Sequence, residues 1–138
     1  MKLRFRICTG SPASTVQKKI LAVNRASFPD SGSAVFDHER RIHAWLQDDR
    51  RRVLSCLYID LGTATVWNVC TDPSFRRQGL MSLLMKETLR AVRTLFPVLH
   101  LHVRKENKTA LRAYKKLRFR VVGDSFAGEA LRMSRKTI

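Results

Sequence analysis

The chain has 138 residues, of which 44% are hydrophobic, and this is typical of one globular domain and excludes an intrinsically disordered chain. Lys and Arg number 27 against 11 Asp and Glu, so the net charge is +16 and polyanions are the natural partners. No apolar stretch has the length of a membrane span or of a signal peptide. The three cysteines form no CxxC pair, which favours a reducing, cytoplasmic location, and we expect no metal site.

The first half of the chain predicts a strand, a helix and three further strands. Polar and apolar residues alternate over residues 3–8 and predict the first strand. Apolar residues at helical spacing follow, with Ser14 or Thr15 as the expected N-cap and Pro29 as the stop, and a second short helix is expected over 31–41. Three strands joined by tight polar turns then predict an antiparallel meander over residues 43–47, 53–60 and 65–71.

The second half alternates between helices and strands. Leucines and other apolar residues at helical spacing predict a long amphipathic helix over 81–95 and a shorter one over 107–116, with a strand over 98–103 between them. Short apolar segments at 121–122 and 131–134 predict the last strands. The whole order predicts an α/β (α+β) fold in a single domain over residues 1–138, with a mixed central sheet of six to seven strands and about four helices on its faces.

A strand, a turn and a helix start follow one another in the middle of the chain. The start of a helix exposes unpaired backbone N–H groups and the positive end of the helix dipole, so it binds anions. Gly79 lets the backbone approach a ligand closely, and Arg76 and Arg77 can add charge-assisted hydrogen bonds to phosphate oxygens. The segment therefore predicts a pyrophosphate site at residues 76–82, although neither GxxxxGK[ST] nor GxGxxG is present.

Two motifs in this region resemble those of the GNAT superfamily of acetyl-CoA-dependent N-acetyltransferases. Residues 76–81, RRQGLM, resemble the RxxGxG/A signature, with Met81 where Gly or Ala is usual. Residues 101–119 resemble the segment LxVxxxNxxAxxxYxxxGF, with Arg118 in place of its glycine and four motif residues present: Asn107, Ala110, Tyr114 and Phe119. The motifs have the family's order and separation, and the resemblance is strongest over about 53–122.

The resemblance implies a GNAT-like fold with acetyl-CoA as cosubstrate. In this family the cofactor enters a V-shaped opening between two strands, here 65–71 and 98–103. Backbone groups of Val69, Cys70 and Thr71 are then expected to pair with the pantetheine arm. Further cofactor contacts are expected from the helix start and from the later motif, namely Arg76, Arg77, Gln78, Gly79, Leu80, Met81, Ser82 and Asn107.

The resemblance also implies two catalytic residues. Tyr114 is expected to act as the general acid that protonates the leaving thiolate. His102 aligns with a glutamate that serves as the base in protein N-terminal acetyltransferases, and an imidazole suits proton uptake at neutral pH. His100, Asp60 or a chain of waters are alternative bases, and His102 as an ordinary strand residue also remains open.

The implied function is direct transfer of the acetyl group to a primary amine in a ternary complex. The acceptor is a protein α-amine, a lysine or a small amine; a polyamine would need carboxylates such as Asp37, Glu39 and Asp60, and the charge of +16 disfavours it. Two alternatives remain: an acyl-CoA-binding pseudo-enzyme, and a non-catalytic nucleic-acid-binding module that uses Arg50–Arg52, Trp45 and Trp67. Weak polyanion association through the basic surface is expected in any case, and the oligomeric state stays open.

Overall fold

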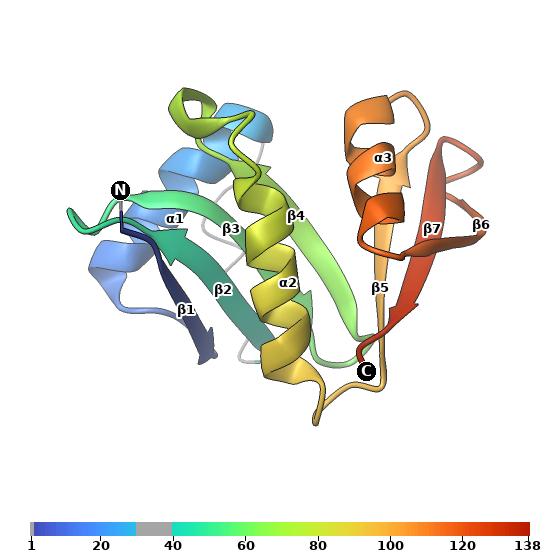
Figure 1. The fold of residues 1–138 in the computed structure, drawn as a ribbon, viewed down its shortest axis with the longest axis horizontal. Coiled ribbons are helices and arrows are strands. Elements are labelled where there is room, and N and C mark those ends of the chain that lie inside the picture. The colour runs from blue at the N-terminus through green and yellow to red at the C-terminus, as the bar shows by residue number, and fades with distance from the viewer. Residues whose placement is uncertain (1, 30–39) are drawn as a thin grey trace.

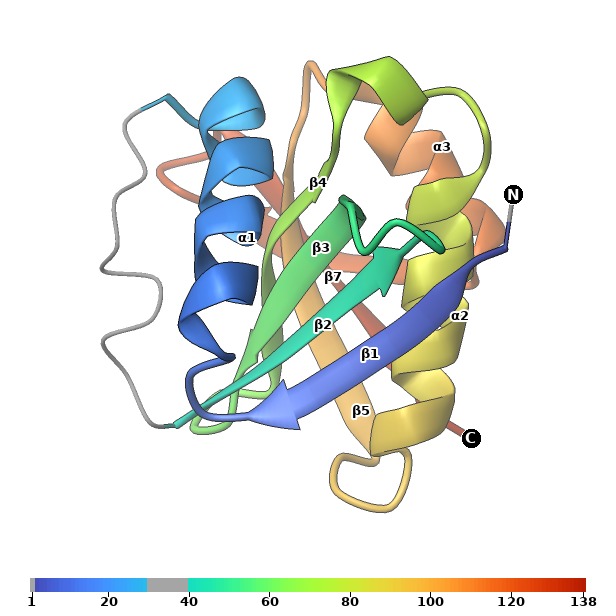
Figure 2. The same ribbon diagram turned by 90° about the vertical axis from the view of Figure 1, so that its left-hand side faces the viewer.

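A mixed sheet of seven strands runs through the computed structural model, which describes residues 2–29 and 40–138 (Figures 1 and 2). In chain order the elements are β1 (Arg4–Thr9), α1 (Ser14–Ser27), β2 (Arg41–Gln47), β3 (Val53–Asp60), β4 (Thr65–Thr71), a 3₁₀ turn η2 (Pro73–Phe75), α2 (Leu80–Val92), β5 (Val98–Arg104), α3 (Lys108–Lys116), β6 (Arg120–Ser125) and β7 (Ala130–Lys136). Within these residues, no helix combines the length and hydropathy that crossing a membrane requires.

The order of strands in the sheet is β1-β2-β3-β4-β5-β7-β6. The pair β4 and β5 is parallel, and the other neighbouring pairs are antiparallel. This confirms the predicted mixed sheet with its meander. The described residues form three α-helices and one 3₁₀ turn instead of about four helices. Of the helix expected over 31–41, residues 31–39 lie outside the described part, and Arg41 already belongs to β2.

The predicted N-cap of α1 was wrong. Ala13 occupies the cap position with an extended backbone, and it makes no side-chain cap hydrogen bond. The chain turns into the helix directly after Pro12, because the Ala13 carbonyl already accepts from Gln17 N at 2.9 Å. The Gln17 side chain also donates to the Pro12 carbonyl, at 2.7 Å. Ser14 is therefore the first residue of the helix and not its cap.

Helices cover both faces of the sheet, and this explains why β2 is buried almost throughout. Ile42, Ala44 and Leu46 belong to the larger core cluster with α2 and α3, whereas Trp45 belongs to a second cluster with α1. Figure 2 shows α1 and α2 on opposite sides of the β1–β3 strands. Because Trp45 is only 5% exposed, it is not available to stack on a nucleic-acid base, the role that the nucleic-acid-binding alternative offered for it.

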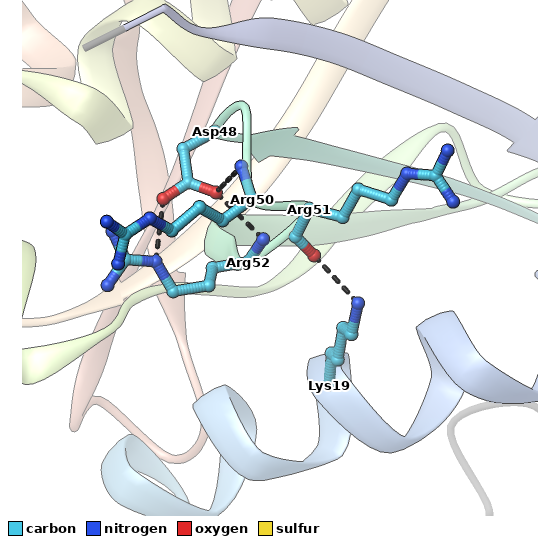
Figure 3. A network of polar contacts seen from close by, with 5 residues as sticks. All are labelled: Lys19, Asp48, Arg50, Arg51 and Arg52. Atoms are coloured by element: carbon cyan, nitrogen blue, oxygen red, sulfur yellow. Dashed lines mark hydrogen bonds and ion pairs between the residues drawn. The ribbon is translucent and has the colours of Figure 1, made fainter.

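The turn between β2 and β3 is built around a buried carboxylate (Figure 3). Asp48 Oδ1 accepts from Arg50 N at 3.0 Å and Arg52 N at 2.9 Å, and Oδ2 pairs with Arg52 Nε at 2.7 Å. Arg51 has a positive φ of 60°, and its carbonyl accepts from Lys19 Nζ at 2.8 Å. The arginine-rich segment is therefore a turn held by its backbone groups and by the Arg52 side chain, with all three arginines exposed.

Candidate active site

The strands β4 and β5 pair over only two residues and then separate. Thr65 lies opposite His100 and Val66 opposite Leu101, and no register partners follow toward their C-terminal ends. A cleft of about 390 Å³ opens there, between two strands that Figure 1 shows close together near the C-terminus and apart at the level of α3. Its lining comes from β4, β5, α3, the end of α1 and the β6–β7 hairpin, and includes Phe28, Trp67, Asn68, Val69, His102, Glu106, Asn107, Tyr114 and Phe126.

A bulge in β4 lies at the wall of the cleft. Trp67 faces Tyr58 and Cys70 faces Cys56, so β4 carries one residue more than β3 between these pairs. Asn68 takes up the irregularity with a left-handed φ of 53°, a conformation that Asn tolerates better than most residues. Asn68 and Val69 thus have no partner residue in β3, and they line the cleft.

The side chain of Cys70 points away from the cleft. Its Sγ donates to Asn24 Oδ1 at 3.4 Å and lies 3.5 Å from Cys56 Sγ, within the core cluster beneath α1. The backbone of β4 at this level is consequently the part that a ligand in the cleft can meet. Thr71 is half-buried, and its carbonyl accepts from Arg76 Nε at 3.2 Å.

The start of α2 offers an anion site without an acidic neighbour in its first turn. Gly79 is the N-cap residue with φ of 72°, and no atom lies within 4 Å of the place where a Cβ would stand. Leu83 N donates to the Gly79 carbonyl at 3.1 Å, so the amides of the three preceding residues, Leu80, Met81 and Ser82, come before the first hydrogen bond of the helix. The positive end of the dipole faces open space at this point.

The two arginines before this helix have different roles. Arg76 is engaged within the fold, because it donates to the Thr71 carbonyl and, at 3.1 Å, to Ser27 Oγ on α1. Arg77 is exposed with a φ of 65°, and Gln78 beside it is also exposed. The side chain of Met81, which departs from the family motif, packs against the core cluster. The structure thus leaves Arg77 as the cation that can turn toward a phosphate at the helix start.

Tyr114 and Asn107 lie on the cleft side of α3. Tyr114 is 6% exposed and its ring meets Phe119 edge-on at 5.9 Å. Burial, and to a smaller extent the nearby Cys70 thiol, raises the pKa of Tyr114 to about 12, so its hydroxyl keeps its proton at neutral pH. Asn107 is the N-cap of α3, where its side chain accepts from Ala110 N at 3.2 Å, and it also lines the cleft.

His102, on β5, also lines the cleft and belongs to an aromatic group. Its ring stacks on Trp67 at 5.2 Å between centroids and meets Phe126 edge-on at 5.0 Å. Burial, with a contribution from Arg132, lowers the pKa of His102 below its usual 6.5, so the ring is neutral at pH 7. Nδ1 lies 2.9 Å from Ser125 Oγ; when it donates there, Nε2 carries the lone pair that can accept a proton.

The other candidate bases lie elsewhere. His100 Nδ1 is hydrogen-bonded to Ser134 Oγ at 2.6 Å, and the residue does not contribute to the cleft wall. Asp60 accepts from Gly62 N at 2.8 Å at the end of β3, opposite the first residue of β4. Asp37 and Glu39 lie outside the described residues. Of the three candidate bases that the structure describes, it places His102 alone in the cleft.

The sequence alone did not single out Glu106 or Phe126 as residues of the site. Glu106 directly precedes Asn107 and supplies the one carboxylate among the described residues of the cleft wall. Phe126 begins a tight hairpin in which three successive residues, Phe126, Ala127 and Gly128, have positive φ values. Gly128, two residues later, indicates a turn, but it does not predict that the Phe126 ring lies 6.3 Å from the Trp67 ring between centroids.

Comparison with known proteins identifies the family. The sequence matches the acetyltransferase (GNAT) family over residues 17–119. It is 33% identical over 97 residues to the [ribosomal protein bS18]-alanine N-acetyltransferase of Salmonella typhimurium, a stretch that covers 67% of this chain and 66% of that relative. The chain thus spans just under two thirds of that protein's length.

Solved structures share the fold at low sequence identity. The ribosomal-protein-S18-alanine N-acetyltransferase of Escherichia coli superimposes with a TM-score of 0.77 at 20% identity, covering 97% of this chain and 94% of that one. NAA60 of Arabidopsis thaliana in complex with acetyl-CoA superimposes with a TM-score of 0.77 at 15% identity, covering 98% of each chain. These likenesses confirm the predicted fold class.

The family match includes both motifs that carried the resemblance, residues 76–81 and residues 101–119. It confirms the acyltransferase class inferred from them, and it favours an enzyme over the non-catalytic nucleic-acid-binding module. The chain belongs to the acetyltransferase (GNAT) family.

Proposed function

We propose that this chain transfers the acetyl group of acetyl-CoA directly to the α-amino group of a protein or peptide, in a ternary complex. The observation that carries the proposal is the cleft between β4 and β5, whose lining includes both a protonated tyrosine and a neutral histidine. The α-amine is favoured because the relative from Salmonella typhimurium is named as an N-acetyltransferase of alanine in ribosomal protein bS18.

The residues at the start of α2 fit the diphosphate of acetyl-CoA. The space beside Gly79 is open, the first helical turn has no acid, and Arg77 is exposed beside it. Asn68 and Val69 of β4 have no partner residue in β3, and they line the cleft. Their backbone groups can therefore contact the pantetheine arm. When bound, acetyl-CoA supplies the thioester that carries the acetyl group.

In this mechanism the residues of the chain move two protons. Nε2 of neutral His102 accepts the proton that the attacking amine loses. The Tyr114 hydroxyl, with its pKa of about 12, holds its proton and gives it to the departing sulfur. Trp67 and Phe126 hold the His102 ring between them and reduce its contact with water. Asn107 contributes a polar contact for the cosubstrate at the start of α3.

The composition of the cleft argues against a polyamine acceptor. Among the described residues of its wall, Glu106 is the one acid, and Arg104 lines the wall beside it. Several separated ammonium groups would need several carboxylates, and the net charge of +16 repels them at a distance. A single α-amine, which reacts in its neutral form, needs no such acidic pocket.

A thiol-release assay tests the proposal directly. Acetyl-CoA is incubated with the chain and with an alanine-started peptide, the same peptide blocked at its N-terminus, a lysine peptide, spermidine and glucosamine. We expect CoA release with the free alanine peptide and none with the blocked one. Release that survives blocking of the α-amine would contradict the proposed acceptor, and the absence of release with every acceptor would contradict the activity.

Binding is measured separately from turnover. Acetyl-CoA is expected to raise the melting temperature of the chain, and the rise is expected to grow with the logarithm of its concentration above the Kd. A chain that gains no thermal stability at millimolar acetyl-CoA would contradict the assignment of the cleft. Thermal stabilisation without any thiol release would instead support the acyl-CoA-binding pseudo-enzyme that the sequence left as an alternative.

A further inference from the structure

A strongly basic groove lies between the C-terminal ends of α2 and α3, away from the cleft. We call it the basic groove. Its volume is about 440 Å³, and it is lined by residues of α2, by the end of α3 and by the C-terminal segment. Six of the residues that line it are cationic: Lys86, Arg90, Arg93, Lys116, Arg118 and Arg135. Figure 1 shows these ends of α2, α3 and the chain on the opposite side from the η2 turn.

Within the described part of the chain, the charges of this groove are almost unopposed. Of the six cations, only Arg90 has an ion-pair partner, Glu87 at 3.4 Å, and its side chain is still 70% exposed. Five of the six residues are exposed and Arg135 is half-buried. Cations gathered around one hollow repel one another, and they raise the local concentration of any anion.

Helix dipoles account for only part of this arrangement. Arg90 lies in the last turn of α2 and Lys116 in the last turn of α3, where cations are favourable. Arg118 and Arg135 lie outside the helices. Arg118, with a φ of 70°, follows Leu117, the C-cap residue of α3, at a position that glycine occupies at least cost. A long cationic side chain stands there instead and lines the groove.

The positive surface continues beyond the basic groove. A second hollow of about 530 Å³ shares three residues with it, Arg118, Arg135 and Ile138, and adds Arg120 and Lys136. A ligand that satisfies both hollows must carry negative charge along its length. A polymer of phosphates meets this requirement, and a single small anion does not.

The lining of the groove distinguishes between kinds of polyanion. Among its described residues no side chain is aromatic, whereas proteins that bind single strands stack bases on aromatic rings. Its leucines, Leu89 and Leu117, are buried, so Ile138 is the one well-exposed apolar residue there, and a protein partner would find little apolar surface. We propose that the basic groove binds the phosphodiester backbone of a double-stranded nucleic acid.

This site is separate from the proposed acetyl-CoA site. Arg90 lies eleven positions after Gly79 along α2, which corresponds to about 16 Å along the helix axis. A duplex on the groove and acetyl-CoA at the start of α2 can therefore be bound at the same time. The proposal does not depend on acetyl transfer, and binding is measured without it.

The test is a fluorescence-anisotropy titration of a labelled RNA duplex of about 20 base pairs over a series of salt concentrations, with a DNA duplex as a second arm. The groove variant is Arg93→Gln, Arg118→Gln, Arg135→Gln. The matched control, Arg4→Gln, Lys18→Gln, Arg25→Gln, removes the same charge from exposed positions on β1 and α1. Melting curves check that both variants fold.

We expect duplex binding with a slope of log K against log salt of about −4 to −5, for about five phosphate contacts. The groove variant is expected to weaken binding at least tenfold more than the control and to reduce the slope by about three. Saturating acetyl-CoA is expected to leave the duplex affinity unchanged. Tighter binding of the RNA duplex or of the DNA duplex supports the proposal and identifies which of the two nucleic acids is the natural ligand.

Three results would overturn the proposal. The first is equal weakening by both variants, because it would mean that only overall charge matters. The second is competition by polyglutamate as effective as that by unlabelled duplex, because it would indicate an acidic protein as the partner. The third is displacement of the duplex by acetyl-CoA, because it would place the duplex in the cleft.

Discussion

Tyr114 combines the two properties that a general acid in this cleft requires. It lines the cavity and it keeps its proton, because burial raises its pKa to about 12. The remainder of the ring packs against Phe119 in the core. Its hydroxyl and its ring therefore have separate roles, and a phenylalanine substitution removes the first while it keeps the second.

We expect Tyr114→Phe to lower kcat by roughly a hundredfold or more, as the loss of a general acid typically does, while the acetyl-CoA-induced rise in melting temperature is retained. The matched control is Tyr58→Phe, which changes the other tyrosine of the chain, a half-buried ring beneath the Arg41 guanidinium and outside the cleft. Turnover by Tyr114→Phe at the wild-type rate would remove Tyr114 from the mechanism.

His102 predicts the shape of the pH–rate profile. Burial lowers its pKa below 6.5, so the neutral, proton-accepting form is lost only as the pH falls through that lowered value. We therefore expect kcat at saturating acceptor to fall on the acidic side with a midpoint below 6.5. No alkaline loss is expected from Tyr114 below about pH 10, because its pKa is about 12.

In His102→Gln this acidic limb is expected to flatten and the plateau rate to drop. His100→Gln is the control, since that imidazole has a pKa lowered by burial as well but is held by Ser134 outside the cleft. An acidic limb that persists unchanged in His102→Gln would assign proton uptake to water or to another group, and Glu106 would be the next residue to test.

At the scale of elements, the N-terminus of α2 depends on the backbone of Gly79. Its φ of 72° strains any other residue, by roughly 1–3 kcal/mol, and the space next to it is open for a ligand. Gly79→Val adds a branched side chain to that space. We expect it to lower the melting temperature and to abolish the further rise that acetyl-CoA produces.

Gly10→Val separates strain from binding. Gly10 has a φ of 82° and likewise no atom near its missing Cβ, but it lies after β1, outside the cleft and the start of α2. The two variants should lose similar stability without ligand, and only Gly10→Val should keep the full acetyl-CoA shift. If both keep it, the diphosphate does not approach the backbone at residue 79.

The elements differ in how far the sequence could predict them. The bounds of β3 and β4 were predicted correctly because polar turns and Pro73 mark their ends. The end of α2 was placed three residues too late, since Leu95 and Phe96 both donate to the Val92 carbonyl in a turn that continues the apolar pattern. The bulge at Asn68 could not be predicted from the residues around it, because it depends on which residues of β3 lie opposite β4. The same holds for the contribution of Asn68 to the cleft.

The candidate site shows the same division. The second motif places Asn107 and Tyr114 seven residues apart, at the start and near the end of one helix, and both line the cleft. The group formed by Trp67, His102 and Phe126 brings together β4, β5 and the β6–β7 hairpin. Such contacts between distant segments are set by the order of strands in the sheet, which alternation of polar and apolar residues does not specify.

At the scale of the whole molecule, covering both faces of the sheet places an ionisable group in the core. His43 lies on β2 with 1% of its surface exposed, close to the Tyr58 ring at 5.7 Å. Burial, with a contribution from the Arg41 charge, lowers its pKa to about 4. The unfolded chain binds a proton at this residue near pH 6.5, while the folded chain does so only near pH 4.

The free energy of unfolding should therefore be largest above pH 6.5 and decrease as the pH falls toward 4. His43 accounts for roughly 2–3 kcal/mol of that decrease by pH 4.5, at 1.36 kcal/mol per unit of pKa shift. Urea unfolding of His43→Leu at pH 7, 5.5 and 4.5 is expected to show a correspondingly shallower loss than the wild type. Carboxylates titrate in both proteins and cancel in the difference. His100→Gln, which removes a less deeply buried imidazole, should change the slope less. Equal slopes in His43→Leu and wild type would mean that folding does not lower the pKa of His43.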